Sequence, residues 1–327
     1  MQKHLCCYMK KDKNMSKVEA PVLLITFNRP DNTIKVFEQI RKAKVPKLYI
    51  ANDAPRENNK QDEEARLEIR KIIELIDWDC EVHTLFQEKN LGCGYGPATA
   101  ISWAFENEDR LIILEDDCVP SLPFFDYCNE LLEKYKNDTR IWLISGRSHH
   151  EGTKFFEKSD YIFSYHGHTW GWATWKRTWE KFDIKMNDFL QFLENGGTRN
   201  LVMPKVEVDL YNKWLLKAYN DIEYLETHAW DIQFAYAQFK NAGLSIVPSK
   251  NLIHNIGYVG THFSGMTSFN LIKASENYEI KRHPIFVLPN FEYEKYHFLH
   301  HIRKIHGKAN IFLRILRKIK KIVLCQK

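Results

Sequence analysis

Residues 111–117 have the sequence Leu111-Ile112-Ile113-Leu114-Glu115-Asp116-Asp117, an aliphatic run that ends on three consecutive acids. Such a run is typical of a strand covered on both faces, as in the parallel sheet of an α/β protein. Ligands usually bind at the carboxyl ends of these strands, and three adjacent carboxylates repel one another unless a cation lies between them. The stretch favours a divalent metal held by oxygen ligands. A solvated acidic turn after an ordinary strand is the alternative.

Strand and helix patterns alternate on both sides of this stretch. Before it, the patterns predict strands at 22–27, 47–51 and 80–86 and helices at 32–43, 61–76 and 97–106, the last preceded by a glycine-rich loop at 90–96. After it, they predict a helix at 123–135, a strand at 141–145, a helix at 232–241 and a strand at 244–247. The βαβαβαβ order of the first part predicts an α/β fold with a doubly wound, mostly parallel sheet and helices on both faces.

Polar side chains follow three of the predicted strands. The first strand supplies Thr26, Asn28 and Arg29, the second supplies Asp53, and the fourth supplies the three acids. Because the carboxyl ends of parallel strands lie at one edge of a sheet, we expect these side chains to share a binding site. Their convergence makes an ordinary acidic turn a weaker interpretation.

Composition limits the possible partners. The chain has 327 residues, 44% of them hydrophobic, which is enough for one large domain or two modest ones. The net charge is +5, but nine lysines and arginines and no acid lie in residues 301–327. The positive charge therefore belongs to a tail, and it gives little reason to expect a nucleic-acid partner.

Cysteines and apolar segments indicate the compartment. Seven cysteines without CxxC spacing argue against a disulfide scaffold and a structural zinc site, so a reducing cytoplasm is the simplest setting. Residues 1–17 are polar and lysine-rich, unlike a signal peptide, and no apolar stretch is long enough to span a bilayer. We expect a polar extension at 1–17, a catalytic domain at 18–300 and a basic tail at 301–327.

The tail combines apolar residues at helical spacing with lysines and arginines at the remaining positions, from Phe312 to Val323. This pattern predicts a basic amphipathic helix suited to an anionic membrane surface. The alternative is that the apolar stripe packs on the body of the protein. The first interpretation places the protein in the cytoplasm, at the inner face of the membrane.

Several of these motifs together resemble the GT-A-fold glycosyltransferases that use nucleotide sugars, over about residues 21–263. Within that group the likeness is to the N-acetylglucosaminyltransferase I type enzymes and to bacterial relatives known as hemolysin-like proteins. The resemblance is carried by Leu24-Ile25-Thr26-Phe27-Asn28-Arg29-Pro30, by Ile112 to Asp117 with Pro120 and Phe124-Phe125, by Trp230-Asp231, and by Asn251 to Gly257 with Gly260-Thr261-His262.

The resemblance implies a role for each acid. Asp117 would be the principal ligand of Mn²⁺ or Mg²⁺, Asp116 would lie near the ribose, and Glu115 would lie near the donor sugar or the metal. Asp53 would hold the nucleotide base, and Asp231 would be the catalytic base of an inverting enzyme. Glu-Asp-Asp departs from the usual Asp-x-Asp pattern, so which carboxylates contact the metal stays open.

Three further features allow two interpretations each. His262, between two glycines, could swing over the diphosphate and ligate the metal, or it could be an ordinary loop histidine. Trp170, Trp172 and Trp175 could form a stacking platform for a sugar, or they could pack in the core. The glycines of the 90–96 loop could let the backbone approach the donor, although no phosphate-binding motif is present.

The sequence thus predicts a metal-dependent, inverting glycosyltransferase. It would move a sugar from a nucleotide diphosphate sugar, with UDP favoured, to a hydroxyl of a glycan or lipid-linked acceptor. A sugar nucleotidyltransferase is the first alternative, but it would usually carry a glycine-rich basic signature where this chain has Asn28-Arg29-Pro30-Asp31. A non-catalytic, membrane-associated carbohydrate-binding protein is the second.

Overall fold

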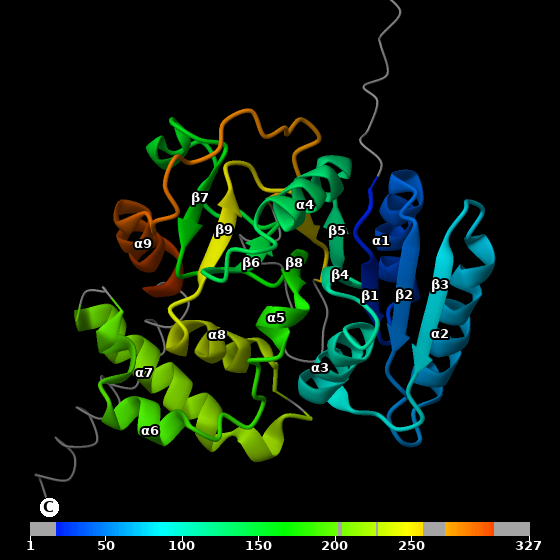
Figure 1. The fold of residues 1–327 in the computed structure, drawn as a ribbon. Coiled ribbons are helices and arrows are strands. Elements are labelled where there is room, and N and C mark those ends of the chain that lie inside the picture. The colour runs from blue at the N-terminus through cyan, green and yellow to red at the C-terminus, as the bar shows by residue number, and fades with distance from the viewer. Residues whose placement is uncertain (1–17, 202–204, 227, 258–271, 304–327) are drawn as a thin grey trace, which may run out of the picture.

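The computed structural model describes residues 18–201, 205–226, 228–257 and 272–303 (Figure 1). His262 and residues 304–327 of the tail lie outside these ranges, so the predictions made for them are not tested. The described strands are β1 (Val22–Thr26), β2 (Lys47–Asn52), β3 (Glu81–Phe86), β4 (Arg110–Glu115), β5 (Cys118–Pro120), β6 (Ile141–Ser145), β7 (Tyr161–Ser164), β8 (Trp172–Trp175), β9 (Leu244–Pro248) and β10 (Ile253–Asn255).

Helices of very different lengths connect these strands. The α-helices are α1 (Pro30–Ala43), α2 (Lys60–Lys71), α3 (Gly92–Ala104), α4 (Leu122–Lys134), α5 (Lys176–Trp179), α6 (Phe189–Glu194), α7 (Lys205–Asn220), α8 (Asp231–Lys240) and α9 (Phe291–His297). Short 3₁₀ turns are η1 (Ile72–Leu75), η2 (Lys154–Phe156), η3 (Gly197–Asn200) and η4 (Ile222–Tyr224), and η5 (Phe298–Ile302) is a π-helical turn. In the described ranges, no helix has the length and apolar composition needed to cross a membrane.

Eight of the strands form one sheet in the order β3-β2-β1-β4-β8-β6-β9-β7. The first four are parallel, β6 and β9 are parallel to each other, and β8 and β7 run antiparallel to their neighbours. A separate two-stranded sheet pairs β5 with β10. The predicted α/β fold with a mostly parallel sheet is confirmed, and the two antiparallel strands are additions that the βαβ pattern did not contain.

Helices cover both faces of the sheet, as the alternation of side chains along β1 shows. Val22 and Leu24 lie in a cluster with residues of α1 and α4, whereas Leu23 and Ile25 lie in a second cluster with residues of α3 and α8. Successive side chains of a strand point to opposite faces. A central strand that is buried at every position therefore requires a helical layer on each side (Figure 1).

The start of α3 differs from the sequence prediction. Residues 92–96 of the predicted loop are instead the N-terminal part of the helix, which begins at Gly92. The Asp53 carboxylate, 39 positions earlier, accepts a hydrogen bond from the Gly92 backbone N–H at 2.9 Å and caps this end of the helix. A capping group so distant in sequence leaves no local signal, which is why the glycines suggested a loop and Pro97 suggested the start of the helix.

The prediction of a sugar-stacking platform is also wrong for two of the three tryptophans. Trp172 and Trp175 belong to β8 and are 0% and 3% exposed, so neither ring is available to a sugar. Trp172 packs against Trp230 and Phe234, with ring centroids 5.7 and 5.2 Å away. Trp170 is half-buried and also packs against the core. Core packing, the alternative interpretation, is what the structure shows.

Replacing Trp172 with alanine should destabilise the protein by about 3–5 kcal/mol, because a fully buried indole leaves a cavity that its neighbours cannot fill. Urea unfolding followed by circular dichroism measures the change. Leu67→Ala is the control, since Leu67 is 59% exposed and should change stability by no more than about 0.5 kcal/mol. Equal effects of the two substitutions would contradict the core assignment.

Candidate active site

The three acids lie at the carboxyl edge of the parallel strands, as predicted. Glu115 is the last residue of β4 and pairs in register with Ile25 of β1. Asp116 and Asp117 form the turn between β4 and β5, beside the end of β1. The aliphatic part of β4 is buried while its end carries the acids, so the sheet itself fixes the position of the carboxylates.

Arg29 is the cation between two of these acids. Its Nη1 lies 2.9 Å from Asp117 Oδ2, and its Nη2 pairs with Asp116 Oδ1. Arg29 immediately precedes α1, so the turn between β1 and α1 brings the guanidinium to the acids. Part of the positive charge that the three carboxylates require therefore comes from the protein itself.

One arginine does not neutralise the whole cluster. Burial, reinforced by Asp117 and Asp116, raises the pKa of Glu115 to about 8. Burial also raises the pKa of Asp116 to about 6, although Arg29 acts in the opposite direction. The site holds more carboxylates than Arg29 can balance, which is the electrostatic condition that an additional cation would relieve.

Asp117 is held by a late part of the chain. Its Oδ1 lies 3.3 Å from Asn255 Nδ2, and its carbonyl oxygen accepts a hydrogen bond from the Ile256 N–H at 2.8 Å. A Cβ atom at Gly257 would overlap Asp117 Oδ2, so a larger residue there would displace the Asp117 carboxylate from its present position. Sequence reasoning gave neither Asn255 nor Gly257 a role at the acids. The signal was present, because both belong to the segment 251–257 that carries part of the family resemblance.

The carboxylates fit a hard divalent cation by their chemistry. Mg²⁺ and Mn²⁺ prefer oxygen ligands, and Mg²⁺ is commonly bound by one or two carboxylates together with substrate phosphates. In the described residues, the acids do not bring three ligand atoms close together, so substrate oxygens would have to complete the coordination. Metal binding at Asp117 Oδ2 would also require its pair with Arg29 to open.

Asp231 is the first residue of α8, one position before the predicted start of this helix, and its carboxylate lies in the same region as the acids. It is close enough to Glu115 to contribute to the raised pKa of that group. Burial raises the pKa of Asp231 itself, although the backbone N–H groups of Asp231 and Ile232 act in the opposite direction. The preceding Trp230 is buried against Trp172 and Trp179, and this packing fixes where α8 begins.

The other predicted binding residues make contacts within the protein. The Thr26 hydroxyl donates to the Ala51 carbonyl at 2.9 Å, and Thr26 is only 3% exposed. Asn28 Nδ2 donates to Asp62 Oδ1 at 2.8 Å. These contacts join β1 to β2 and to the start of α2. Of the three residues supplied by the first strand, the structure brings Arg29 into contact with the acids.

Asp53 supports the backbone around it. Its carboxylate accepts from the N–H groups of Leu91 and Gly92 and from Asn90 Nδ2. Burial raises the pKa of Asp53, while these backbone hydrogen bonds act to lower it. A structural cap is therefore present where the resemblance implied contact with a nucleotide base.

Asp53→Ala should lower the free energy of unfolding by about 1–2 kcal/mol, the usual effect of losing a capping side chain. Urea unfolding measures it. Asp53→Asn keeps one acceptor oxygen and should lose less. If Asp53 also holds a base, the asparagine variant should weaken nucleotide binding at nearly normal stability. Unchanged stability in the alanine variant would contradict the cap.

The glycines at the start of α3 allow a close approach by another part of the chain. Gly92 has a φ of +72°, and a Cβ there would overlap the Glu226 carbonyl oxygen. A Cβ at Gly94 would overlap the Leu225 carbonyl oxygen, to which the Gly94 N–H donates at 3.0 Å. These glycines are needed for packing against residues 225–226, and no donor is required to explain them.

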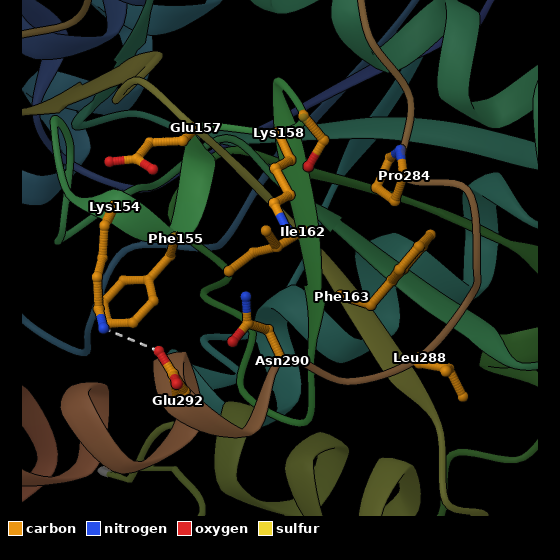
Figure 2. Close-up of a pocket in the computed structure, with 11 residues that line it drawn as sticks. Lys154, Phe155, Glu157, Lys158, Ile162, Phe163, Pro284, Leu288, Asn290 and Glu292 are labelled. Atoms are coloured by element: carbon orange, nitrogen blue, oxygen red, sulfur yellow. Dashed lines mark ion pairs between the residues drawn. The ribbon is translucent and has the colours of Figure 1, made fainter.

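A pocket of about 380 Å³ lies elsewhere, between β7, η2 and the segment before α9 (Figure 2). Lys154 and Glu292 form an ion pair of 3.0 Å at its rim. None of its lining residues belongs to the acidic site. The candidate active site therefore rests on the arrangement of the acids rather than on this pocket.

No protein-family model matches this chain, and no curated protein sequence matches it either. One solved structure with a partial likeness is a UDP-glucose pyrophosphorylase complexed with UDP-glucose, with 13% sequence identity and a TM-score of 0.26. The likeness covers 45% of this chain and 62% of the pyrophosphorylase chain. An overlap this weak says nothing about the activity of the present protein.

Proposed function

We propose that the protein is a metal-dependent, inverting glycosyltransferase of the GT-A type. It would transfer a sugar from a nucleotide diphosphate sugar, with UDP favoured, to a hydroxyl of a glycan or lipid-linked acceptor. The observation that carries the proposal is the cluster of Glu115, Asp116 and Asp117 at the carboxyl edge of β4, with Arg29 between the acids and Asp231 nearby.

The donor side of the reaction requires positive charge. Negative charge develops on the diphosphate as it leaves the anomeric carbon, and a bound Mn²⁺ or Mg²⁺ would stabilise that charge. Asp117 would hold the metal. Once Asp117 turns away from Arg29, the guanidinium is available to the diphosphate, because its planar fork matches two phosphate oxygens. The Arg29 guanidinium would thus release the Asp117 carboxylate and pair with the diphosphate of the donor.

The acceptor side requires a base. The attacking hydroxyl loses its proton as the new bond forms, and a carboxylate within hydrogen-bond reach can take that proton. Asp231 is suited to this task because burial raises its pKa and makes it a stronger base than an exposed aspartate. Its position at the start of α8 holds the carboxylate at one place beside the acids.

The proposed acceptor also accounts for the basic tail. Residues 304–327 would hold the enzyme at an anionic membrane surface, where a lipid-linked acceptor is found. This part of the proposal rests on the sequence, because residues 304–327 lie outside the described ranges.

A panel of nucleotide sugars tests the function. The purified protein is incubated with each donor in the presence of Mn²⁺, Mg²⁺ or a chelator, and release of the nucleoside diphosphate is measured. Release from at least one donor that depends on metal supports the proposal. Consumption of a nucleoside triphosphate and a sugar 1-phosphate would instead identify a nucleotidyltransferase. Failure to bind any nucleotide sugar with metal present would contradict both activities.

A further inference from the structure

A second cluster of ionisable side chains consists of histidines and shares no residue with the acidic site. Its members come from three places in the chain: the segment after β6, the segment between β7 and β8, and the helical stretch formed by α9 and η5. They are His149, His150, His166, His168, His297 and His301. Such a concentration of imidazoles needs an explanation, because the acidic site uses none of them.

We propose that His149, His168 and His301 bind a divalent transition metal of the zinc class. Each offers one ring nitrogen, and the three ligand atoms lie within 4.8 Å of one another. In a tetrahedral zinc site with Zn–N distances of about 2.0–2.1 Å, ligand nitrogens are about 3.3 Å apart. The rings would have to close by no more than about 1.5 Å, which rotation about side-chain bonds can supply.

The ring packing agrees with this arrangement. The ring of His149 has its centroid 3.8 Å from that of His301 and 4.3 Å from that of His168. The ring centroids of His168 and His301 are 5.2 Å apart. Each of the three rings is therefore adjacent to the other two, although their positions in the sequence span more than 150 residues.

The protonation state of the cluster suits a metal. Burial is the main cause that lowers the pKa of His168 well below its usual value, and the neighbouring His301 is the second cause. Burial also lowers the pKa of His149 well below its usual value. Neutral imidazole is the form that ligates metal, so binding would displace few protons near pH 7. Packing charged imidazolium groups this closely would cost far more than packing neutral rings.

The hydrogen bonding of His168 also bears on metal binding. His168 Nε2 is buried and has no hydrogen-bond partner within the part of the chain that the structure describes, and the same holds for His297 Nε2. Buried polar atoms in folded proteins are almost always paired, and a bound ion is one of the explanations for an unpaired one. A metal bound to His168 would satisfy one of these atoms directly.

The neighbouring residues could orient the ligands. His297 lies four positions before His301 on the same helical stretch, and its Nδ1 is 3.0 Å from His150 Nε2. Hydrogen-bonded residues around a metal site fix the rings that ligate it. Bound metal would tie the helical stretch of α9 and η5 to the segments after β6 and before β8. The site would thus stabilise this side of the fold.

The two clusters should select different metals. Imidazole nitrogens suit zinc, copper and nickel, whereas the carboxylates of the acidic site suit Mg²⁺ and Mn²⁺. No residue belongs to both groups. Zinc binding by the histidines is therefore independent of the proposed glycosyltransferase activity, and its test can succeed or fail separately.

Zinc titration of the full chain, purified without a polyhistidine tag, tests the proposal. We expect one equivalent of Zn²⁺ to bind, a rise in melting temperature, and tetrahedral absorption bands when Co²⁺ replaces zinc. His149→Asn should weaken zinc binding by more than about 100-fold, since loss of a ligand exceeds the effect of losing an outer partner. His150→Asn is the matched control, because His150 is adjacent but not a ligand, and its loss should weaken binding by no more than the roughly 10–100-fold of an outer partner.

Three outcomes would overturn the proposal. The first is that the unaltered protein takes up no zinc and gives no tetrahedral Co²⁺ bands, a result that holds whether or not the variants fold. The second is equal loss of zinc binding in the His149 and His150 variants. The third is loss of zinc binding in Asp117→Asn, which should bind zinc as the unaltered protein does if the site is built from histidines.

Discussion

Replacing Asp117 with asparagine is expected to lower metal-dependent sugar transfer by at least about 100-fold. Loss of an outer-shell partner already reduces metal affinity or activity by about 10–100-fold, and loss of the principal ligand should exceed that. Asparagine keeps the size of the side chain, while the charge that would hold the metal and pairs with Arg29 is removed. The measurement is initial rate against Mn²⁺ concentration with a saturating donor.

The matched control for this change is Asp109→Asn. Asp109 is exposed and directly precedes β4, so it lies at the opposite end of the same strand. Its replacement should leave the rate within about twofold, as expected for a surface substitution. If Asp117→Asn retains normal metal dependence, the acidic site does not hold the catalytic metal, and the proposed mechanism fails at its first step.

Asp231→Asn is expected to lower kcat by about 100- to 10,000-fold, the range for loss of a general base. Donor binding should change little, because Asp231 acts on the acceptor.

The base works only when ionised, so kcat/KM of the unaltered enzyme should fall as pH drops through the pKa of Asp231. Burial raises that pKa, which moves this fall to a higher pH than for an exposed aspartate. In the Asp231→Asn variant, kcat/KM should no longer fall over this pH range.

Glu63→Gln provides the control for Asp231. Glu63 is an exposed acid in the first turn of α2, so its replacement removes the same favourable interaction with a helix N-terminus without touching the site. Normal activity is expected. A kcat that is equally low for both variants would mean that helix stability, rather than a proton acceptor, explains the effect at Asp231.

The main features of the fold were predictable because they depend on local patterns. The aliphatic run of β4 and the strand at 141–145 have the apolar character that their burial on both faces requires. Two features were not predictable for a common reason. The start of α3 depends on Asp53, which is distant in sequence, and Trp172 and Trp175 lie on a four-residue strand too short to show a period.

The site was predictable in its location more than in its contacts. Strand order alone places Arg29 and the three acids at one edge of the sheet. That Arg29 pairs with the acids, and that Gly257 packs against Asp117, depends on side-chain geometry and on a turn far along the chain. The histidine cluster gave only short-range signals in the sequence, namely the adjacent pair His149-His150, the i,i+2 pair His166 and His168, and the four-residue spacing of His297 and His301. These pairs are far apart in the chain, and nothing in the sequence shows that they meet.

The pairing of β5 with β10 has a consequence for the order of assembly. The contact between Asp117 and Asn255 spans 138 positions, whereas β1 to β4 are joined by much shorter connections. Closing a longer loop costs more chain entropy, and such contacts are favoured only after shorter-range structure has formed. On the ribosome, the parallel strands and their acids would therefore fold before β10 emerges. A nascent chain would carry an incomplete site until residue 257 has been synthesised.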